Sequence, residues 1–332
     1  MKNLPSRSIK RRTVVAGLGA GLASSWTSIT RAADYPTKPI MLVAPWPTGG
    51  GSEFITRAIA PVMQRILGQP IVIESRPGAT GTIGSKFVAS SAPDGYTIVL
   101  GVADSHSIFP QLMKNPPYDA KRDFTALAPI GYTPSALVAH SSVPAKNIAE
   151  LTRYAKSASK PISYGSWGVG SSAQIMMESI SNTLGVKMLH VPFQGSGPMH
   201  MAVMGGHIDL AILPIATILE SVKSKSTNYH VIGMNTERRV AELPDLPTLT
   251  EQGISVLEPW VGVLGPAGMP LDIQAKLHDA ISKAVADPEV QAKFKTVYLV
   301  SKSMSLTEYQ RSYASEYDRW GAVIKAAKIS LD

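Results

Sequence analysis

Residues 40–55 constrain the fold more than any other segment of the chain. A short continuous apolar run at residues 40–44 is followed by Pro45, Trp46 and Pro47, then by three glycines, and then by a helix-like start at Ser52. A continuous apolar run bounded by turn residues is typical of a strand buried on both faces. The segment therefore predicts a strand, a glycine loop and a helix whose first free N–H groups favour an anion.

The same kind of unit recurs along the chain. Further short, largely apolar segments are expected as strands at residues 71–73, 96–100, 136–139, 162–164, 188–191, 208–213, 230–234 and 261–264. Segments with helical spacing of apolar residues separate most of them, which favours an α/β fold with largely parallel sheets and right-handed crossovers. Ligands of such folds bind at the carboxyl ends of strands, so we expect the binding site in the strand-end loops.

A chain of 332 residues is long enough for two domains. The pattern changes near Pro134, after which a strand leads into a second series of units. The strand at 261–264 and the amphipathic helices at 271–285 and 309–324 are expected to return to the first domain. We therefore predict one lobe from residues 34–134 plus 256–332 and a second lobe from residues 135–255.

The first 33 residues read as an export signal. A basic start is followed by a weakly apolar Gly/Ala-rich run and a small-residue site, which predicts cleavage after Ala32 or Ala33. Arg11 and Arg12 partly match a twin-arginine signal, and Sec export stays open. Removing this segment takes away six basic residues and lowers the formal net charge from +8 to +2. We expect a free periplasmic protein without the basic face that nucleic-acid binding requires.

Several classes of site are excluded by residue content. The chain has no cysteine, which rules out disulfides, a thiol nucleophile and Cys-based metal sites. His200 and His207 are seven residues apart and no HExxH motif occurs, so we expect no metal and no cofactor. Outside the signal, no stretch approaches the roughly 20 apolar residues of a membrane span. Nothing in the sequence indicates an oligomer, and a monomer is expected.

Two interpretations apply to each candidate binding feature. The glycines at 49–51 and 168–172 either offer backbone N–H groups to two carboxylates or serve only as tight turns. Trp46 and Trp167, in strand-end loops of opposite lobes, either wall a planar ligand or cover the core. Asp104, Ser105 and His106 follow a third strand and either line the site or form a solvated loop.

An enzymatic alternative rests on two serines. Ser166 and Ser171 could act as nucleophiles near His190, which would make the protein a periplasmic serine hydrolase. The chain contains no G-x-S-x-G nucleophile elbow, and no sequence feature positions a base for either serine. We therefore expect a binding protein and not an enzyme.

The mature chain resembles the Bug-type extracytoplasmic receptors of tripartite tricarboxylate transporters. The resemblance rests on ordered motifs over residues 35–320: Y-P-T-K-P-I (35–40), P-W-P-T-G-G (45–50), E-S-R-P-G-A (74–79), P-D-G-Y-T (93–97), H-V-P-F (190–193), G-G-H-I-D (205–209), L-P-D-L-P-T (243–248) and P-A-G-M-P (266–270).

The resemblance implies a two-lobed periplasmic binding protein, of the type with two interlobe crossings, that closes on a carboxylated small molecule and delivers it to a membrane permease. In this family the first strand–helix loop of one lobe and a Ser/Gly loop of the other hold the ligand carboxylates. The resemblance thus implies the candidate binding residues Pro47, Thr48, Gly49, Gly50, Ser166, Trp167, Gly168, Gly170, Ser171, Ser172, Pro192 and Phe193. The strand-end positions discussed above add Trp46, Asp104 and Ser105 to this set.

Two departures from the family pattern narrow the range of expected ligand classes. Trp46 replaces the usual phenylalanine of the first loop, and Leu213-Pro214 stands where amino-acid and hydroxy-acid binders often carry Asp. We therefore expect an aromatic carboxylate or a dicarboxylate. Presentation of the ligand to a sensor kinase, in place of a permease, stays open.

Overall fold

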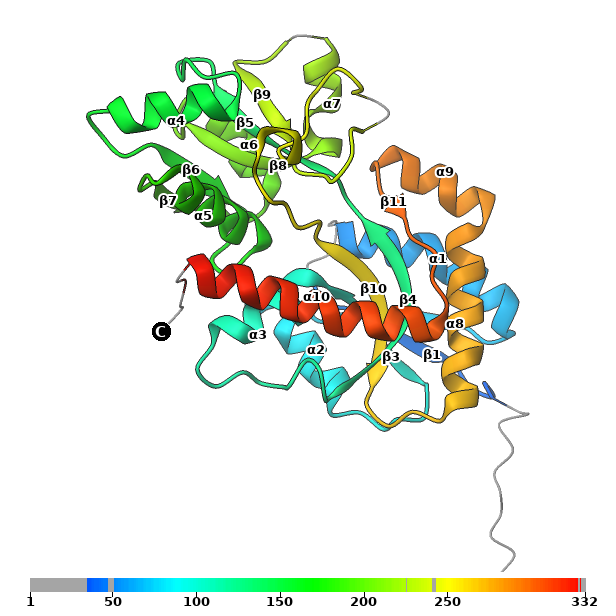
Figure 1. Ribbon diagram of the computed structural model, residues 1–332. Helices are drawn as coiled ribbons and strands as arrows, with labels where there is room; N and C mark the ends of the chain where they lie inside the picture. Colours follow the sequence, from blue (N-terminus) through cyan, green and yellow to red (C-terminus); the bar gives the residue numbers. More distant parts are fainter. Residues whose placement is uncertain (1–34, 47–50, 225, 241–242, 328, 330–332) are drawn as a thin grey trace, which may run out of the picture. The chain divides into compact units, whose positions relative to one another are not determined.

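The computed structural model describes residues 35–46, 51–224, 226–240, 243–327 and 329, so the predicted export signal lies outside it. The described residues form two β-sheets with helices on both faces of each (Figure 1). The first sheet, in the order β11-β4-β10-β3-β1-β2, contains β1 (Ile40–Ala44), β2 (Ile71–Ser75), β3 (Thr97–Val102), β4 (Phe124–Tyr132), β10 (Trp260–Pro266) and β11 (Val300–Ser301). The second, in the order β7-β6-β8-β5-β9, contains β5 (Ser135–His140), β6 (Ser163–Ser166), β7 (Leu189–Pro192), β8 (Leu210–Pro214) and β9 (Tyr229–Met234).

The first sheet is mixed, whereas the sequence predicted largely parallel sheets. β1 runs parallel to both of its neighbours, β2 and β3, whereas β10 runs antiparallel to β3 and β4. Side chains of β1 alternate between the faces: Ile40 and Leu42 pack against α1 (Gly51–Leu67) and α8 (Leu271–Ala286), and Val43 packs against α2 (Thr82–Ala89) and α10 (Leu306–Ala327). All three side chains are fully buried, which confirms the prediction of a strand covered on both faces.

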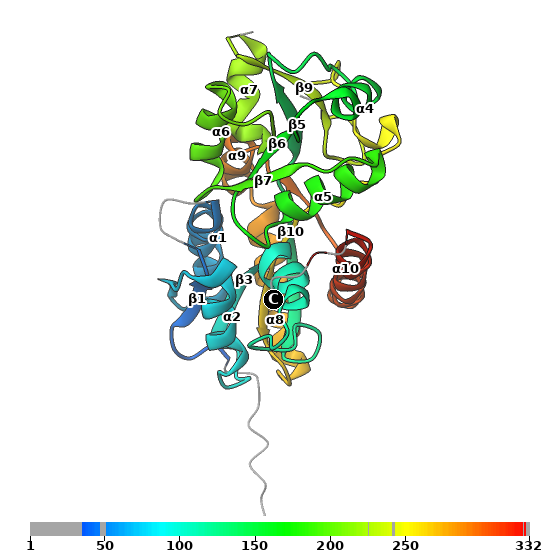
Figure 2. The same ribbon diagram turned by 90° about the vertical axis from the view of Figure 1, so that its left-hand side faces the viewer.

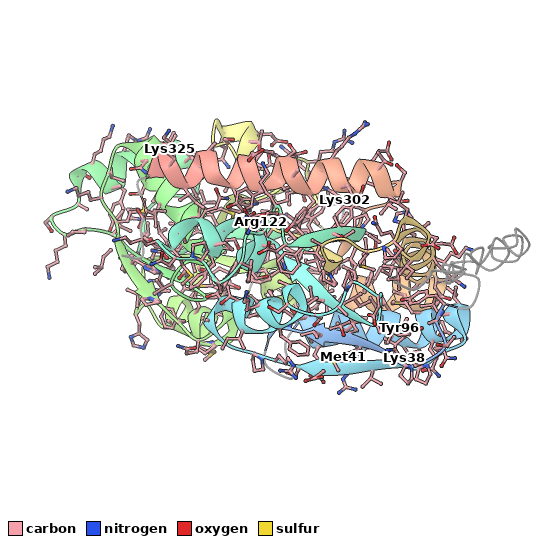
Figure 3. All side chains as sticks on the ribbon, turned by 90° about the horizontal axis from the view of Figure 1, so that it is seen from below. Lys38, Met41, Tyr96, Arg122, Lys302 and Lys325 are labelled. Carbon is pink, nitrogen blue, oxygen red and sulfur yellow. The ribbon has the colours of Figure 1, made fainter. Side chains whose placement is uncertain are left out.

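The residues before β1 are anchored to the turn before β3. The Tyr35 hydroxyl donates to the Gly95 carbonyl at 2.7 Å, and the Thr37 amide donates to the Tyr96 hydroxyl at 2.9 Å. The ammonium of Lys38 lies 4.2 Å from the centre of the Tyr96 ring; both residues are labelled in Figure 3. These contacts hold the start of β1 in register, so that its other end presents Trp46.

The second sheet is also mixed and is covered on both faces (Figure 2). α4 (Ile148–Ser157) and α5 (Ser172–Leu184) cover one face, and α6 (Ser196–Met204) and α7 (Ile215–Lys223) cover the other. β6 runs parallel to β7 and β8, while β5 runs antiparallel to β8 and β9. The parallel part of this sheet therefore ends where the predicted Ser/Gly loop begins.

The chain passes between the sheets twice. It leaves the first sheet after β4 and enters β5 three residues later, and it returns between β9 and β10 by way of η4 (Thr250–Gln252). First-lobe segments also enter the second core, because Ile108, Leu112, Trp320 and Ile324 pack with α5. Tyr35–Asp332 is one compact unit. The exact lobe boundaries at 134/135 and 255/256 therefore stay a prediction.

Some elements differ from the sequence-based expectation. β4 was not expected, because Pro129 and Gly131 interrupt its apolar pattern; Pro129 pairs at a register shift against β10, which accommodates its missing N–H. α6, α7 and α9 (Pro288–Thr296) were also not expected. Residues 104–106, expected as a loop, begin the buried helical turn η3 (Asp104–Ile108), which continues into α3 (Phe109–Leu112). A short 3₁₀ turn, η2 (Ala79–Gly81), precedes α2.

Candidate functional site

The predicted binding residues follow paired strands in each sheet. Trp46 follows β1, and Asp104 comes shortly after its parallel partner β3. Ser166 ends β6, and Phe193 follows its parallel partner β7. Parallel strands end at the same edge of a sheet, so the fold gathers these residues into one group per lobe. The predicted loop residues Pro47, Thr48, Gly49 and Gly50 lie outside the described part of the chain.

The Ser/Gly loop at residues 166–172 is held by two side-chain hydrogen bonds to a single backbone carbonyl, that of Gly168. The carbonyl of Gly168 accepts hydrogen bonds from the Ser166 hydroxyl at 2.9 Å and from the Ser171 hydroxyl at 2.6 Å. Gly168 and Gly170 have φ values of +147° and +75°, which side-chain-bearing residues rarely adopt. The loop therefore has a defined shape that leads directly into α5.

Several N–H groups at the start of α5 have partners within the protein. The Gly170 amide donates to the Gln174 side-chain oxygen at 2.8 Å, and the Gln174 amide donates to the N-cap hydroxyl of Ser171 at 3.4 Å. The Ser172 amide donates to Oδ1 of Asp104 at 3.1 Å. An internal carboxylate thus contacts the helix end at which the sequence predicted a ligand carboxylate.

Asp104 connects the two lobes. Its Oδ2 also accepts the indole N–H of Trp167 at 3.1 Å, so both carboxylate oxygens bond donors of the second lobe. The side chain is nearly inaccessible, at 7% exposure. Burial raises the pKa of Asp104, and the hydrogen bonds from Ser172 and Trp167 oppose that rise.

Ser105 and His106 face the first-lobe core. The Ser105 hydroxyl lies 2.8 Å from Nδ1 of His106, whose ring packs 4.7 Å from the centre of the Phe124 ring. The Ser105 carbonyl accepts the Tyr118 hydroxyl at 2.5 Å. Burial lowers the pKa of His106 to about 3, so its ring is neutral at ordinary pH. The solvated-loop interpretation is therefore wrong for this segment, since all of η3 is buried.

Ser166 and His190, which the hydrolase alternative placed near each other, form a hydrogen-bonded pair. The Ser166 hydroxyl lies 2.7 Å from Nε2 of His190, and the His190 ring stacks on Tyr164 with the ring centres 5.0 Å apart. Tyr164 in turn donates to Glu178. Ser166 is fully buried and its hydroxyl also contacts the Gly168 carbonyl. This arrangement braces the Ser/Gly loop and leaves the serine hydroxyl no exposure to solvent.

The two predicted tryptophans have different surroundings. Trp167 is half-buried, packs against the cores on both faces of the second sheet and directs its N–H to Asp104. The indole nitrogen of Trp46 is buried and has no hydrogen-bond partner among the described residues. It lies beside Gly81, where an added Cβ would be 3.3 Å from the Trp46 nitrogen and 3.2 Å from the Ser105 Cβ. Trp46 and Ser105 are therefore neighbours on the first lobe.

Pro192 and Phe193 lie next to the Ser/Gly loop. The Phe193 amide donates to the Ser166 carbonyl at 2.9 Å, and the Phe193 ring packs against the core under α6 and α7. Pro192 is exposed. Their predicted contact with ligand stays a prediction.

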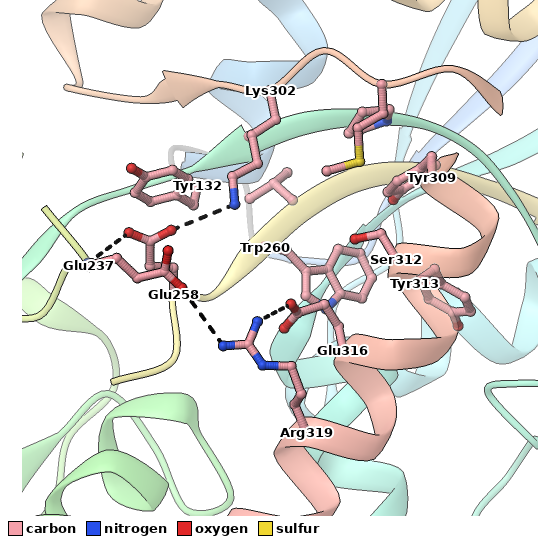
Figure 4. Close-up of a pocket in the computed structure, with 14 residues that line it drawn as sticks. Tyr132, Glu237, Glu258, Trp260, Lys302, Tyr309, Ser312, Tyr313, Glu316 and Arg319 are labelled. Carbon is pink, nitrogen blue, oxygen red and sulfur yellow. Dashed lines mark hydrogen bonds and ion pairs between the residues drawn. The ribbon is translucent and has the colours of Figure 1, made fainter. Parts of the chain in front are cut away.

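A cavity of about 40 Å³ lies elsewhere, where the returning chain meets α10 (Figure 4). Such a volume holds a few water molecules. Lys302 pairs with Glu258 at 3.6 Å across it, and Arg319 pairs with Glu237 at 3.8 Å. Its lining comes from segments far apart in the sequence, which is why no local pattern predicted it. A second, smaller cavity lies between α5, α10 and residues 254–257. Neither borders a predicted binding residue, so a ligand cleft between the lobes stays a prediction.

Of the charged side chains that line the larger cavity, Glu258 has low exposure, at 9%, whereas Lys302, Arg319 and Glu237 are 46–63% exposed. Burial raises the pKa of Glu258, and Lys302 acts in the opposite direction. Burial together with Glu258 raises the pKa of Tyr132 to about 12. Among the described residues, no group of three or more His, Cys, Asp or Glu side chains has the arrangement of a metal site. No helix in the described part of the chain is long and apolar enough to cross a membrane.

Comparisons with known proteins agree with this architecture. A UPF0065 protein from the tcbD-tcbE intergenic region of Pseudomonas sp. (strain P51) is 30% identical over 331 residues, covering 98% of this chain and 96% of that protein. The structure of R. palustris Rpa4515 with adipate superimposes with a TM-score of 0.78 at 28% identity, covering 90% of this chain and 99% of that one. The periplasmic binding protein BugD superimposes with a TM-score of 0.75 at 29% identity, covering 89% and 99%.

The family itself is defined by a match over most of the chain. Residues 55–329 match the family TctC, described as the tripartite tricarboxylate transporter family receptor. The two mixed α/β sheets have the architecture of its two-lobed periplasmic relatives, which confirms both the predicted fold class and the resemblance to Bug-type proteins. The chain belongs to the receptor family of the tripartite tricarboxylate transporters.

Proposed function

We propose that this protein is a periplasmic solute receptor that captures a small carboxylate, either an aromatic carboxylate or a dicarboxylate, and delivers it to a permease of the tripartite tricarboxylate type. The observation that carries the proposal is the family match over residues 55–329 combined with the likeness to Rpa4515, whose structure contains adipate. On this proposal the export signal is cleaved after Ala32 or Ala33 and the mature receptor works as a monomer.

The chemistry of the strand-end residues supports a carboxylate ligand. The described residues 44–46, 103–108, 166–172 and 192–197 contain indole, hydroxyl and backbone N–H donors and no Lys or Arg. A hydrogen bond from a neutral donor to a charged acceptor contributes about 1.5–3 kcal/mol. Among these donors, the buried Trp46 indole nitrogen has no hydrogen-bond partner among the described residues, which supports its use for a ligand carboxylate that loses its water as the lobes close.

A thermal-shift screen tests the proposal. Mature protein is denatured and refolded to remove retained ligand, and it is then screened against C4 to C8 dicarboxylates, citrate, nicotinate, benzoate and the phthalate isomers. A ligand at 100 times its dissociation constant stabilises the folded state by about 2.7 kcal/mol, which raises Tm measurably. We expect at least one carboxylate to do so. If none does while the refolded protein melts cooperatively, the proposed ligand class is wrong.

A further inference from the structure

Asp104 reaches from the first lobe to the anion-binding end of a second-lobe helix. Its Oδ1 accepts a hydrogen bond from the amide of Ser172, which is the first residue of α5. Its Oδ2 accepts a hydrogen bond from the indole N–H of Trp167, and both distances are 3.1 Å. Helix N-termini favour negative charge because their first N–H groups lack helical partners. Here that favourable position is taken by a carboxylate of the protein itself.

Most donors described at the start of α5 already have partners within the protein, and the buried Ser172 hydroxyl is an exception. The amides of Gly170, Ser171 and Gln174 already bond the Gln174 side chain, the Gly168 carbonyl and the Ser171 hydroxyl. A ligand carboxylate placed at this end of α5 would therefore compete with Asp104 for the Ser172 amide. It would also lie beside the Asp104 carboxylate, which carries the same sign of charge. The groups of Ser172 and Trp167 that hydrogen-bond Asp104 are uncharged, so they neutralise neither carboxylate.

We propose that Asp104 is a specificity-determining residue that restricts this receptor to ligands with a single carboxylate. This inference rests on the proposed function. The Asp104 carboxylate occupies the place of a second ligand carboxylate and makes interlobe hydrogen bonds to Ser172 and Trp167. The part of the ligand that approaches Asp104 and Trp167 is accordingly uncharged, which favours an aromatic or aliphatic monocarboxylate over a dicarboxylate.

The first lobe offers a further neutral donor next to Asp104. The buried indole nitrogen of Trp46 has no partner among the described residues and lies close to Ser105, the neighbour of Asp104 in the chain. A buried donor without a partner favours an acceptor supplied from outside the protein. The single ligand carboxylate is therefore expected on the Trp46 side of Asp104 and away from α5.

Matched ligand pairs test the inference by calorimetry. Hexanoate is compared with adipate, and benzoate with terephthalate, because each pair differs mainly by one carboxylate. The refolded proteins are the wild type, Asp104→Asn, which removes the charge, and Asp104→Ser, which also removes the bulk. Asp318→Asn serves as control, because Asp318 is an exposed aspartate that pairs with Lys121 on the surface.

We expect the wild type and Asp318→Asn to bind the monocarboxylate of at least one pair tenfold or more tightly than its dicarboxylate. Both Asp104 variants should reduce that ratio at least tenfold. Equal or tighter binding of the dicarboxylates by the wild type, or an unchanged ratio in a folded Asp104 variant, would overturn the inference while leaving the proposed function intact. If neither variant folds, the wild-type ratio alone decides. Failure of the wild type to bind any of the four acids would overturn the inference, whereas the proposed function fails only if the wider thermal-shift screen also yields no carboxylate ligand.

Discussion

At the scale of single residues, close backbone approaches decide several positions. Gly262 in the middle of β10 is one, because a Cβ there would overlap the Tyr309 hydroxyl and lie 3.0 Å from the Ala128 carbonyl oxygen. The Tyr309 hydroxyl is buried and has no partner among the described residues. Gly262 is therefore required by the ring of α10 that packs over it, and not by a turn.

We expect Gly262→Ala to lower the free energy of unfolding by about 1–3 kcal/mol through overpacking. Tyr309→Phe removes the overlapping hydroxyl, so by itself it should change stability little, and in the double variant it should restore part of the loss. Urea unfolding of the three variants measures this. Gly197→Ala in α6, where nothing lies within 4 Å of the added Cβ, is the control and should not destabilise. Equal losses in the single and double variants would contradict the packing argument.

At the scale of elements, the Ser/Gly loop is held by groups that are remote in sequence. β7 supplies His190 to the Ser166 hydroxyl at the end of β6, and η3 supplies Asp104 to the start of α5. Apart from Ser166, which ends β6, the loop lies outside the sheet. We therefore expect its hydrogen bonds to contribute more to ligand binding than to global stability.

His190→Phe tests that separation. The phenyl ring can keep the stacking on Tyr164 but has no nitrogen to bond Ser166, so the loop loses one support. We expect affinity for whichever carboxylate stabilises the wild type to fall tenfold or more, with Tm lowered by only a few degrees. His200→Phe is the matched control, because His200 is in the same lobe and its hydrogen-bond partner is the Tyr229 hydroxyl, 3.2 Å away, and not a residue of the loop. Equal affinity in the two variants would show that the His190 contact does not position the loop.

At the scale of the whole molecule, the lobes are joined by more than the two crossings. α10 packs on the first sheet through Tyr309 and Tyr313 and enters the second core through Trp320 and Ile324. Ion pairs from Arg319 and Lys302 to glutamates of the returning segment line the cavity between these parts (Figure 4). The Glu258 side chain is only 9% exposed, which distinguishes its pair from the surface pairs.

Lys302→Met should destabilise the protein by about 1 kcal/mol at pH 7, because Glu258 then lacks its cation at low exposure. Burial already holds the pKa of Glu258 above its usual value in the folded state, and loss of Lys302 raises it further. The penalty on the charged form is present at neutral pH and disappears as the pH falls and Glu258 binds a proton. The loss should therefore be smaller at pH 5 than at pH 7, as measured by urea unfolding.

Lys283→Met is the control for this prediction. Lys283 pairs with Asp279 on an exposed face of α8, with side-chain exposures of 62% and 54%. Such a pair contributes below about 0.5 kcal/mol, so its removal should matter little at either pH. A Lys302→Met loss no greater than that of Lys283→Met, or one independent of pH, would contradict the role given to Glu258.

Local patterns in the sequence were sufficient for most of the architecture. Short, mainly apolar runs of three to five residues predict strands, and the runs at residues 40–44, 71–73 and 230–234 all lie within strands of the structure. Such runs do not always indicate burial on both faces, because 71–73 belongs to the edge strand β2 and Val72 is exposed. They failed at β4, where Pro129 and Gly131 mask the pattern, and at α6, whose apolar residues do not follow one face. The ordered motifs added the family, which the comparison over residues 55–329 confirms.

By itself, then, the sequence determined the α/β class, the strand-end loops and the family, because these depend on periodicity and on residues adjacent in the chain. Only the tertiary structure decided that Asp104 bonds the start of α5, that His190 bonds Ser166 and that Glu258 pairs with Lys302. These contacts join residues 24 to 68 positions apart. Which side chains meet over such separations depends on strand order and packing, and no local pattern encodes either.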